Sequence, residues 1–158
     1  MSTRLAELTG LPPDRIQHVG STAVPHLSAK PILDFDLGLK PNEDRKALVL
    51  ALIEAGFIDR GTGTTGIARL LVWEPHLHAS TVHLHLVTYR SIRWECDIAF
   101  RDALRTDHAL RKSYFCLKAK LAKRFPTNRR AYREGKAKFI ANALYRIKAT
   151  DWPTNGLS

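Results

Sequence analysis

Between residues 16 and 88, apolar side chains recur at every second position in short stretches separated by glycine and proline. This period is typical of strands with one buried face. The pattern predicts five strands, at 16–19, 31–38, 57–60, 67–73 and 82–88. Two helices accompany them, at 3–8 and at 43–55, with Asn42 as the expected N-cap of the second.

Beyond Ser91 the apolar period changes to three or four residues, which indicates helices. Ser91, Asp107 and Asn128 each stand where an N-cap would begin one, so we predict three helices that continue to about residue 148. A mixed or antiparallel sheet followed by a run of helices is an α+β fold. We expect one domain over residues 1–150 and a C-terminal tail over 151–158.

The composition is that of a globular protein, with 44% hydrophobic and 25% charged residues in 158. Cys96 and Cys116 lack the spacing of a metal or redox motif, and we expect buried thiols in a reducing compartment. The first residues, MSTRLAELTG, lack the apolar segment of a signal peptide, and no apolar run approaches the roughly 20 residues of a membrane span. These features predict a cytoplasmic protein without a membrane partner.

Charge is the unusual bulk property, because the chain carries a net charge of +10 and its C-terminal half holds most of the basic residues. Such a field attracts polyanions, either a triphosphate or a nucleic acid. The alternative is a basic helix surface that is simply solvated. No nucleic-acid-reading motif accompanies the charge.

The candidate chemistry lies between residues 17 and 39. A short apolar strand leads into Gly20 and Ser21, where exposed backbone N–H groups and a hydroxyl suit phosphate oxygens. The next strand carries Asp34 and Asp36, which must point to the same face. Paired carboxylates beside a phosphate-binding turn are typical of a Mg²⁺ site completed by phosphates. Lys30 lies between the two motifs and favours this interpretation over an exposed strand face that binds nothing.

The histidines offer an alternative metal site. His76 and His78 form one H-x-H pair and His83 and His85 another, and on a hairpin both pairs could converge on zinc. We favour instead an arrangement in which His83 or His85 faces the two aspartates, as a ligand, a phosphate donor or a proton acceptor. Arg101, beside Asp102, is either half of a buried ion pair or a triphosphate clamp.

The segment HVGSTAVPHLSAKPILDFD resembles the hallmark of the GrpB family, and VHLHLV, AFRDALR and KAKFI also resemble GrpB segments. The resemblance runs from about Ile16 to Leu144. The Gly-Ser and Asp-x-Asp spacing is similar to the signature of the DNA polymerase beta-like nucleotidyltransferases. Two departures stand out: His26 occupies a position where glycine is usual, and the strand at 82–88 offers His83 and His85 where active relatives carry a third carboxylate.

The resemblance implies a nucleotidyltransferase that binds a nucleoside triphosphate and Mg²⁺ or Mn²⁺ and transfers a nucleotidyl group to an unknown acceptor. Asp34 and Asp36 are the predicted metal ligands, and with His85 the predicted catalytic residues. The predicted nucleotide-binding residues are Gly20, Ser21, Thr22, Lys30 and Arg101. The alternative is a non-catalytic domain of the same fold that binds an anionic ligand or a protein partner. A third option is nucleic-acid binding through the basic C-terminal helices.

Overall fold

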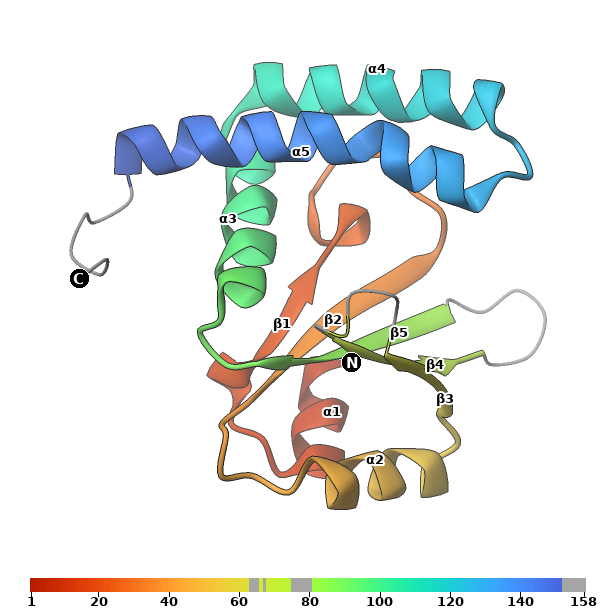
Figure 1. Ribbon diagram of the computed structural model, residues 1–158, viewed down its shortest axis with the longest axis vertical. Helices are drawn as coiled ribbons and strands as arrows, with labels where there is room; N and C mark the ends of the chain where they lie inside the picture. Colours follow the sequence, from red (N-terminus) through yellow and green to blue (C-terminus); the bar gives the residue numbers. More distant parts are fainter. Residues whose placement is uncertain (63–65, 67, 75–80, 152–158) are drawn as a thin grey trace. The chain divides into compact units, whose positions relative to one another are not determined.

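The computed structural model describes residues 1–62, 66, 68–74 and 81–151 (Figure 1). The chain divides into two compact units, Met1–Ile98 and Ala99–Ser158. The first unit contains the sheet, the helices α1 (Ser2–Thr9) and α2 (Arg45–Glu54), and the start of a third helix. The α+β prediction is confirmed.

The sheet of the first unit has five strands in the order β1-β2-β5-β4-β3. Their bounds are β1 Ile16–Val19, β2 Ile32–Leu39, β3 Ile58–Thr62, β4 Arg69–Trp73 and β5 Thr81–Thr88. The two central strands, β2 and β5, pair in parallel, and the other neighbours are antiparallel. The sheet is therefore mixed, and all five strands fall within a few residues of the predicted ranges.

Strand periodicity separates the two faces of the sheet. Phe35 and Leu37 of β2 and Leu84 of β5 join Leu5 of α1 and Leu52 of α2 in one buried cluster. Figure 1 shows α1 and α2 on this same side of the sheet. The alternate positions on β2 and β5, which include the polar motifs, face the opposite side. Burial of one face thus fixes the register that presents the polar residues on the other.

One predicted helix start is wrong. The N-cap of α2 is Asp44, not Asn42, because the Asp44 carboxylate accepts hydrogen bonds from the backbone N–H groups of Lys46 and Ala47. Asn42 lies two residues too early, and Asp and Asn are equally good caps, so composition could not choose between them.

The helices α3 (Ile92–Thr106), α4 (His108–Arg124) and α5 (Arg129–Asp151) follow the sheet. The three predicted caps are confirmed: backbone N–H groups donate to the side chains of Ser91, Asp107 and Asn128. In the second unit, Tyr114 is buried and stacks on Phe139, so it belongs to the core. The expected burial of the two thiols is wrong, because Cys116 is exposed and Cys96 is half-buried.

No helix among the described residues is long and apolar enough to cross a membrane.

Candidate metal centre

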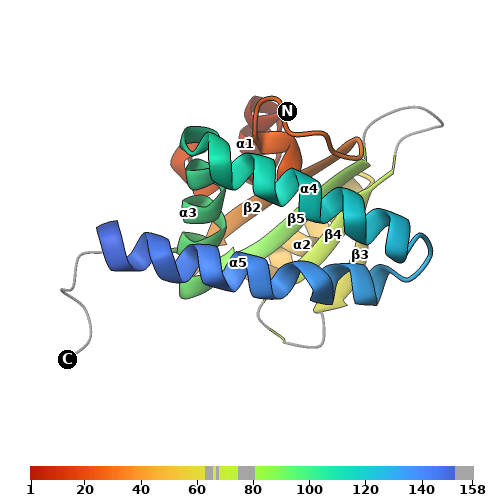
Figure 2. The ribbon, with the colours of Figure 1, turned by 90° about the horizontal axis from the view of Figure 1, so that it is seen from above.

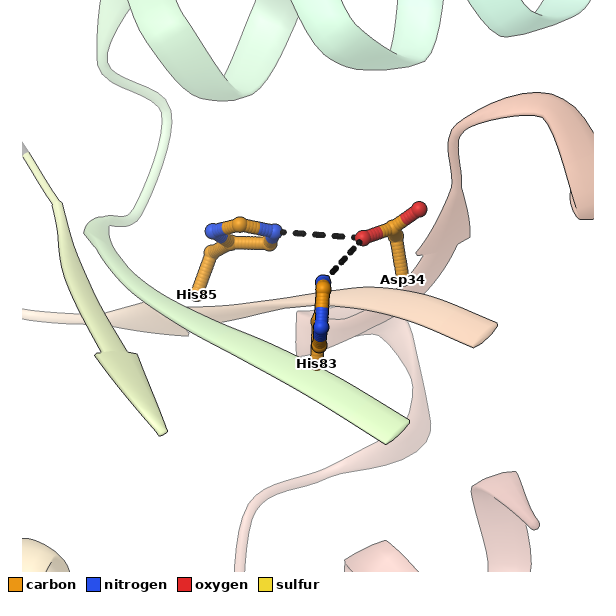
Figure 3. Close-up of side chains that lie close together, drawn as sticks. All are labelled: Asp34, His83 and His85. Atoms are coloured by element: carbon orange, nitrogen blue, oxygen red, sulfur yellow. Dashed lines mark hydrogen bonds and ion pairs between the residues drawn. The ribbon is translucent and has the colours of Figure 1, made fainter. Parts of the chain in front are cut away.

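Three polar side chains converge on the face of the sheet opposite α1 and α2 (Figure 3). The Asp34 Oδ1 atom lies 3.2 Å from His83 Nδ1 and 3.5 Å from His85 Nε2. One donor atom from each residue lies within 4.8 Å of the other two. Each side chain keeps between 22% and 28% of its surface exposed, so a small ion from solvent could reach the cluster.

The pairing of β2 with β5 brings these residues together. In the parallel register Asp34 is the partner of His83, and Asp36 is the partner of His85. Because side chains alternate along a strand, all four positions point to one face. β1 lies on the other side of β2, with Val19 opposite Asp34. β1, β2 and β5 are therefore neighbours in one sheet, as the expected approach of a histidine to the aspartates requires.

The distances in the cluster match those between ligands of a transition metal. Metal–nitrogen and metal–oxygen bonds of about 2.0–2.2 Å at tetrahedral angles place ligand atoms about 3.3–3.5 Å apart. The observed separations from Asp34 Oδ1 are 3.2 and 3.5 Å. Two imidazole nitrogens and one carboxylate oxygen form a donor set that suits Mn²⁺, Fe²⁺ or Zn²⁺ better than Mg²⁺, which prefers oxygen. The two separations from Asp34 Oδ1 thus match those between ligands of a divalent cation, and all three donor atoms lie within 4.8 Å of one another.

Electrostatics keep Asp34 in the form that a cation requires. Burial by itself would raise the pKa of Asp34, but hydrogen bonds and charge interactions with His83 and His85 lower it to about 2. The carboxylate is therefore ionised throughout the neutral range.

Asp36 has a different environment, although it shares the face of Asp34. It is fully buried, and neither carboxyl oxygen has a hydrogen-bond partner among the described residues. Burial first, and then the nearby Asp97 carboxylate, raises the pKa of Asp36 to about 8. Asp36 is also not among the three residues whose donor atoms converge. Its predicted role as a metal ligand stays a prediction.

Gly20 gives the Asp34 carboxylate its space. A Cβ atom on Gly20 would lie 2.7 Å from Asp34 Oδ2, closer than a real contact allows. Its φ of 71° is also in the region that favours glycine. Gly20 therefore allows the end of β1 to pack closely against the Asp34 carboxylate. The close approach of a phosphate to the same glycine stays a prediction.

The Gly20→Ala variant should lose metal affinity by at least about tenfold, because the added methyl group displaces the carboxylate, and fold stability should fall by about 1–3 kcal/mol. Gly10→Ala is the matched control: Gly10 has a φ of 67° but nothing within 4 Å of an added Cβ. It should lose similar stability from backbone strain and keep its metal affinity. Calorimetric titration with Mn²⁺ and urea unfolding separate the two effects. Equal metal affinity in both variants would contradict this role of Gly20.

The turn after Gly20 is held by side-chain hydrogen bonds. The Thr22 hydroxyl donates to the Ile32 carbonyl (2.8 Å) and lies 3.1 Å from His18 Nε2. With its proton committed to Ile32, the hydroxyl can accept from His18. Thr22 therefore joins the 3-10 turn η2 (Ser21–Ala23) to the start of β2. Its predicted contact with a phosphate stays a prediction, as does that of Ser21 in the same turn.

The remaining predicted site residues lie elsewhere. Lys30 is exposed in the loop before β2. Arg101 belongs to the second unit, where its Nε atom donates to Asp102 Oδ1 at 2.7 Å. The sequence left two alternatives for Arg101, half of a buried ion pair with Asp102 or a triphosphate clamp. Arg101 does pair with Asp102, but the Asp102 side chain is 48% exposed. His76 and His78 lie outside the described residues.

His26 has a φ of 64°, a conformation that favours glycine. The positive φ explains why glycine suits this position. A histidine can adopt the same backbone conformation only with strain.

Sequence reasoning missed the surroundings of Asp36. Arg93 and Asp97, on the first turns of α3, interact electrostatically with this carboxyl group. Their spacing of four residues on a helix is a signal for an ion pair with each other, and the two side chains do pair. Nothing in the spacing links them to β2.

The structure is thus an α+β fold with a carboxylate and two imidazoles on one face of a mixed sheet. The GrpB protein family matches residues 1–146, and the chain belongs to this family. It is 37% identical over 141 residues to a UPF0157 protein of Pseudomonas aeruginosa, covering 88% of this chain and 57% of that protein. It is 32% identical over 135 residues to the glutamate-rich protein GrpB of Alkalihalophilus pseudofirmus, covering 82% of this chain and 76% of the relative.

The crystal structure of the conserved protein GrpB from Enterococcus faecalis has a similar fold. It matches with a TM-score of 0.78 and 26% identity, over 96% of this chain and 90% of that one. Some relatives are much longer, since the chain spans only 57% of the Pseudomonas protein and 37% of a UPF0157 protein of Bacillus subtilis.

Proposed function

We propose that the chain binds a divalent transition metal ion through Asp34, His83 and His85, and that it uses this site to hold the phosphates of a nucleoside triphosphate for nucleotidyl transfer. The observation that carries the proposal is the convergence of three donor atoms within 4.8 Å on one sheet face. A bound cation would supply charge neutralisation at the phosphate oxygens. The site would bind Mn²⁺ more tightly than Mg²⁺, because two of the three ligands are nitrogens.

The residues around the cluster have defined tasks in this proposal. Gly20 follows the last residue of β1 and lies beside Asp34, and the backbone of Gly20 and Ser21 would orient the triphosphate. The hydroxyl of the unknown acceptor would attack the α-phosphorus in line. The bond between the α-phosphorus and the bridging oxygen to the β-phosphate would break, so that pyrophosphate leaves with the electron pair and the hydroxyl proton passes to solvent.

A second candidate function is a binding domain without catalysis. It is favoured by the single carboxylate in the converging group, because two-metal transfer needs enough carboxylates to bridge two cations about 3.5–4 Å apart. In this case the metal and an anionic ligand would be held but not converted.

Metal titration tests the metal site, which both candidate functions share. After treatment with a chelator, the protein should bind Mn²⁺ at least about tenfold more tightly than Mg²⁺. His83→Ala and His85→Ala should each weaken Mn²⁺ binding by more than about tenfold, as expected for the loss of one ligand. His108→Ala is the control, because His108 is exposed at the start of α4. Nitrogen hyperfine coupling in the electron spin echo of bound Mn²⁺ would identify imidazole ligation directly.

Two results would contradict the metal site: equal Mn²⁺ affinity in wild type and both histidine variants, or bound Mn²⁺ without nitrogen coupling. Nucleotide binding is then measured with Mn²⁺ present. Triphosphate affinity that depends on Mn²⁺ in wild type but not in Asp34→Asn supports nucleotide binding at the metal. Affinity that is the same with and without metal would overturn it.

A further inference from the structure

The net positive charge of the chain comes entirely from the second unit. Residues 99–158 contain 15 Lys and Arg against 4 Asp and Glu, a net charge of +11. Residues 1–98 contain 10 Lys and Arg against 11 Asp and Glu, a net charge of −1. The field that attracts anions is therefore a property of the helical unit, independent of the metal cluster in the first unit.

Several of these bases are exposed and have no acidic partner among the described residues. On α4 they include Lys112, Lys120, Lys123 and Arg124, and on α5 Arg133 and Lys138. In the described part of the chain, no carboxylate forms an ion pair with any of them. Three acids of this unit are engaged elsewhere: Asp102 pairs with arginines of α3, Asp107 caps α4, and Glu134 pairs with Arg130.

The packing of α4 against α5 also brings two lysines together. The helices lie side by side (Figure 2) and approach closely at Gly135, where an added Cβ would lie 2.5 Å from Leu121 Cδ2. Lys118 and Lys136 flank this contact, and each ammonium group lies over a tyrosine ring of its own helix. Burial first, and then the charge of Lys136, lowers the pKa of Lys118 to about 8. An anion near the two ammonium groups would relieve this repulsion.

The extent and character of the surface indicate the kind of anion. α4 has 17 residues and α5 has 23, so the basic helices are about 25 and 35 Å long, enough to follow several successive phosphates. One nucleotide would neutralise only a part of this charge. Two aromatic side chains of the same helices are exposed, Phe115 at 44% and Tyr145 at 77%. Exposed aromatics among bases are typical of surfaces on which unpaired bases stack.

From these observations we infer that the α4–α5 surface binds single-stranded nucleic acid through its phosphate backbone, without base-specific readout. The bases supply the affinity by release of counterions, and Tyr145 or Phe115 supplies stacking for a single strand. This activity would belong to the second unit alone and does not depend on the metal site.

Fluorescence anisotropy with labelled single-stranded RNA and DNA of about 20 nucleotides tests the inference, since such strands exceed the site size of small binding modules. The Lys120→Gln/Lys123→Gln/Arg124→Gln variant should bind at least about tenfold more weakly at low salt. Its slope of log K against log salt should be flatter by about 2, because each lost contact to a single strand contributes about 0.7. Glutamine keeps the helix propensity of the replaced residues, and circular dichroism verifies the fold.

The matched control removes the same charge from the first unit, in the variant Lys40→Gln/Lys46→Gln/Arg60→Gln at three exposed positions. Its affinity and salt slope should equal those of wild type. Tyr145→Ala should weaken binding without changing the slope. Asp34→Asn should bind the strands like wild type, which separates this inference from the proposed metal site.

Several results would overturn the inference. Equal losses of affinity in both triple variants would show that binding depends only on the net charge of the protein. Tripolyphosphate that competes as well as the oligonucleotide at equal phosphate would assign the surface to a small polyphosphate. Tighter binding to duplex than to single strands, to vesicles of anionic lipid instead of strands, or no binding at low salt would also contradict it.

Discussion

Replacing Asp36 by asparagine should stabilise the protein strongly at pH 8 and only slightly at pH 4. The ordinary pKa of this carboxyl group is 3.8, and burial, followed by the Asp97 charge, raises it to about 8 in the folded state. The pKa of Asp36 is thus higher in the folded than in the unfolded state. Its ionisation therefore leaves the free energy of unfolding unchanged below pH 3.8 and lowers it increasingly as the pH rises toward 8. At about 1.4 kcal/mol per pH unit, the penalty reaches at most about 5 kcal/mol at pH 8 and stays below about 1 kcal/mol at pH 4.

Asparagine cannot ionise, so its variant escapes the part of the penalty that depends on pH. The cost of burying its amide is present at both pH values and cancels in the comparison. The free energy of unfolding is measured in urea at pH 4, 6 and 8 with a chelator present. Glu54→Gln is the control, because it removes one negative charge at an exposed position of α2. A difference between Asp36→Asn and wild type that does not change with pH would contradict the raised pKa.

The expected destabilisation of the fold by Asp36 also bears on function. Charged or polar groups that are buried without partners concentrate at functional sites, where stability is lost in favour of activity. Asp36 lies on the same face as Asp34, His83 and His85, and in register with His85. If Asp36→Asn gains stability and loses metal or nucleotide affinity together, the buried carboxyl serves the site.

The site could be predicted only in part from the sequence, and the missing part has a physical cause. Period two places Asp34 and Asp36 on one face and His83 and His85 on one face, without any knowledge of the fold. β2 and β5 are parallel neighbours because β3 and β4, which lie between them in the sequence, are placed beyond β5 in the sheet. Local patterns do not specify this order. The sequence therefore indicated that one histidine faces the aspartates, whereas the register brings both to Asp34.

The burial of Asp36 was beyond sequence reasoning for a related reason. An Asp-x-Asp motif on a strand is symmetric in sequence, so both carboxylates were predicted to be equivalent metal ligands. The structure makes them unequal, because Asp34 interacts with two imidazoles while Asp36 is buried near the Asp97 carboxylate of α3. Residues 61 positions apart in the chain, with no shared pattern, decide the difference. Helix caps such as Asp107, by contrast, follow from local chemistry and were predicted correctly.

The choice of metal ion should decide between transfer and binding alone. Two nitrogens and one carboxylate hold Mg²⁺ poorly, because Mg²⁺ prefers oxygen ligands in a near-octahedral shell, whereas Mn²⁺ accepts imidazole. We therefore expect release of pyrophosphate from a nucleoside triphosphate to be at least about tenfold faster with Mn²⁺ than with Mg²⁺. His85→Asp replaces a nitrogen with a carboxylate next to Asp36 in the sheet register, and it should raise the Mg²⁺ rate. His85→Asn is the matched control, since it removes the imidazole without adding a charge, and it should lower the rate with both ions.

Asp34→Asn is the blank of this assay, because it removes the carboxylate of the cluster. Rapid turnover of wild type with Mg²⁺ would show that another oxygen ligand completes the site and that the histidines are not the determinants of metal choice. Absence of turnover with either ion, in wild type and in His85→Asp alike, would leave a domain that binds a metal and an anion without transfer. A Mg²⁺ rate that rises in His85→Asp but not in His85→Asn is the decisive result for transfer. Only a carboxylate that ligates the reacting metal can improve it there, and a purely structural role of His85 predicts no gain from either substitution.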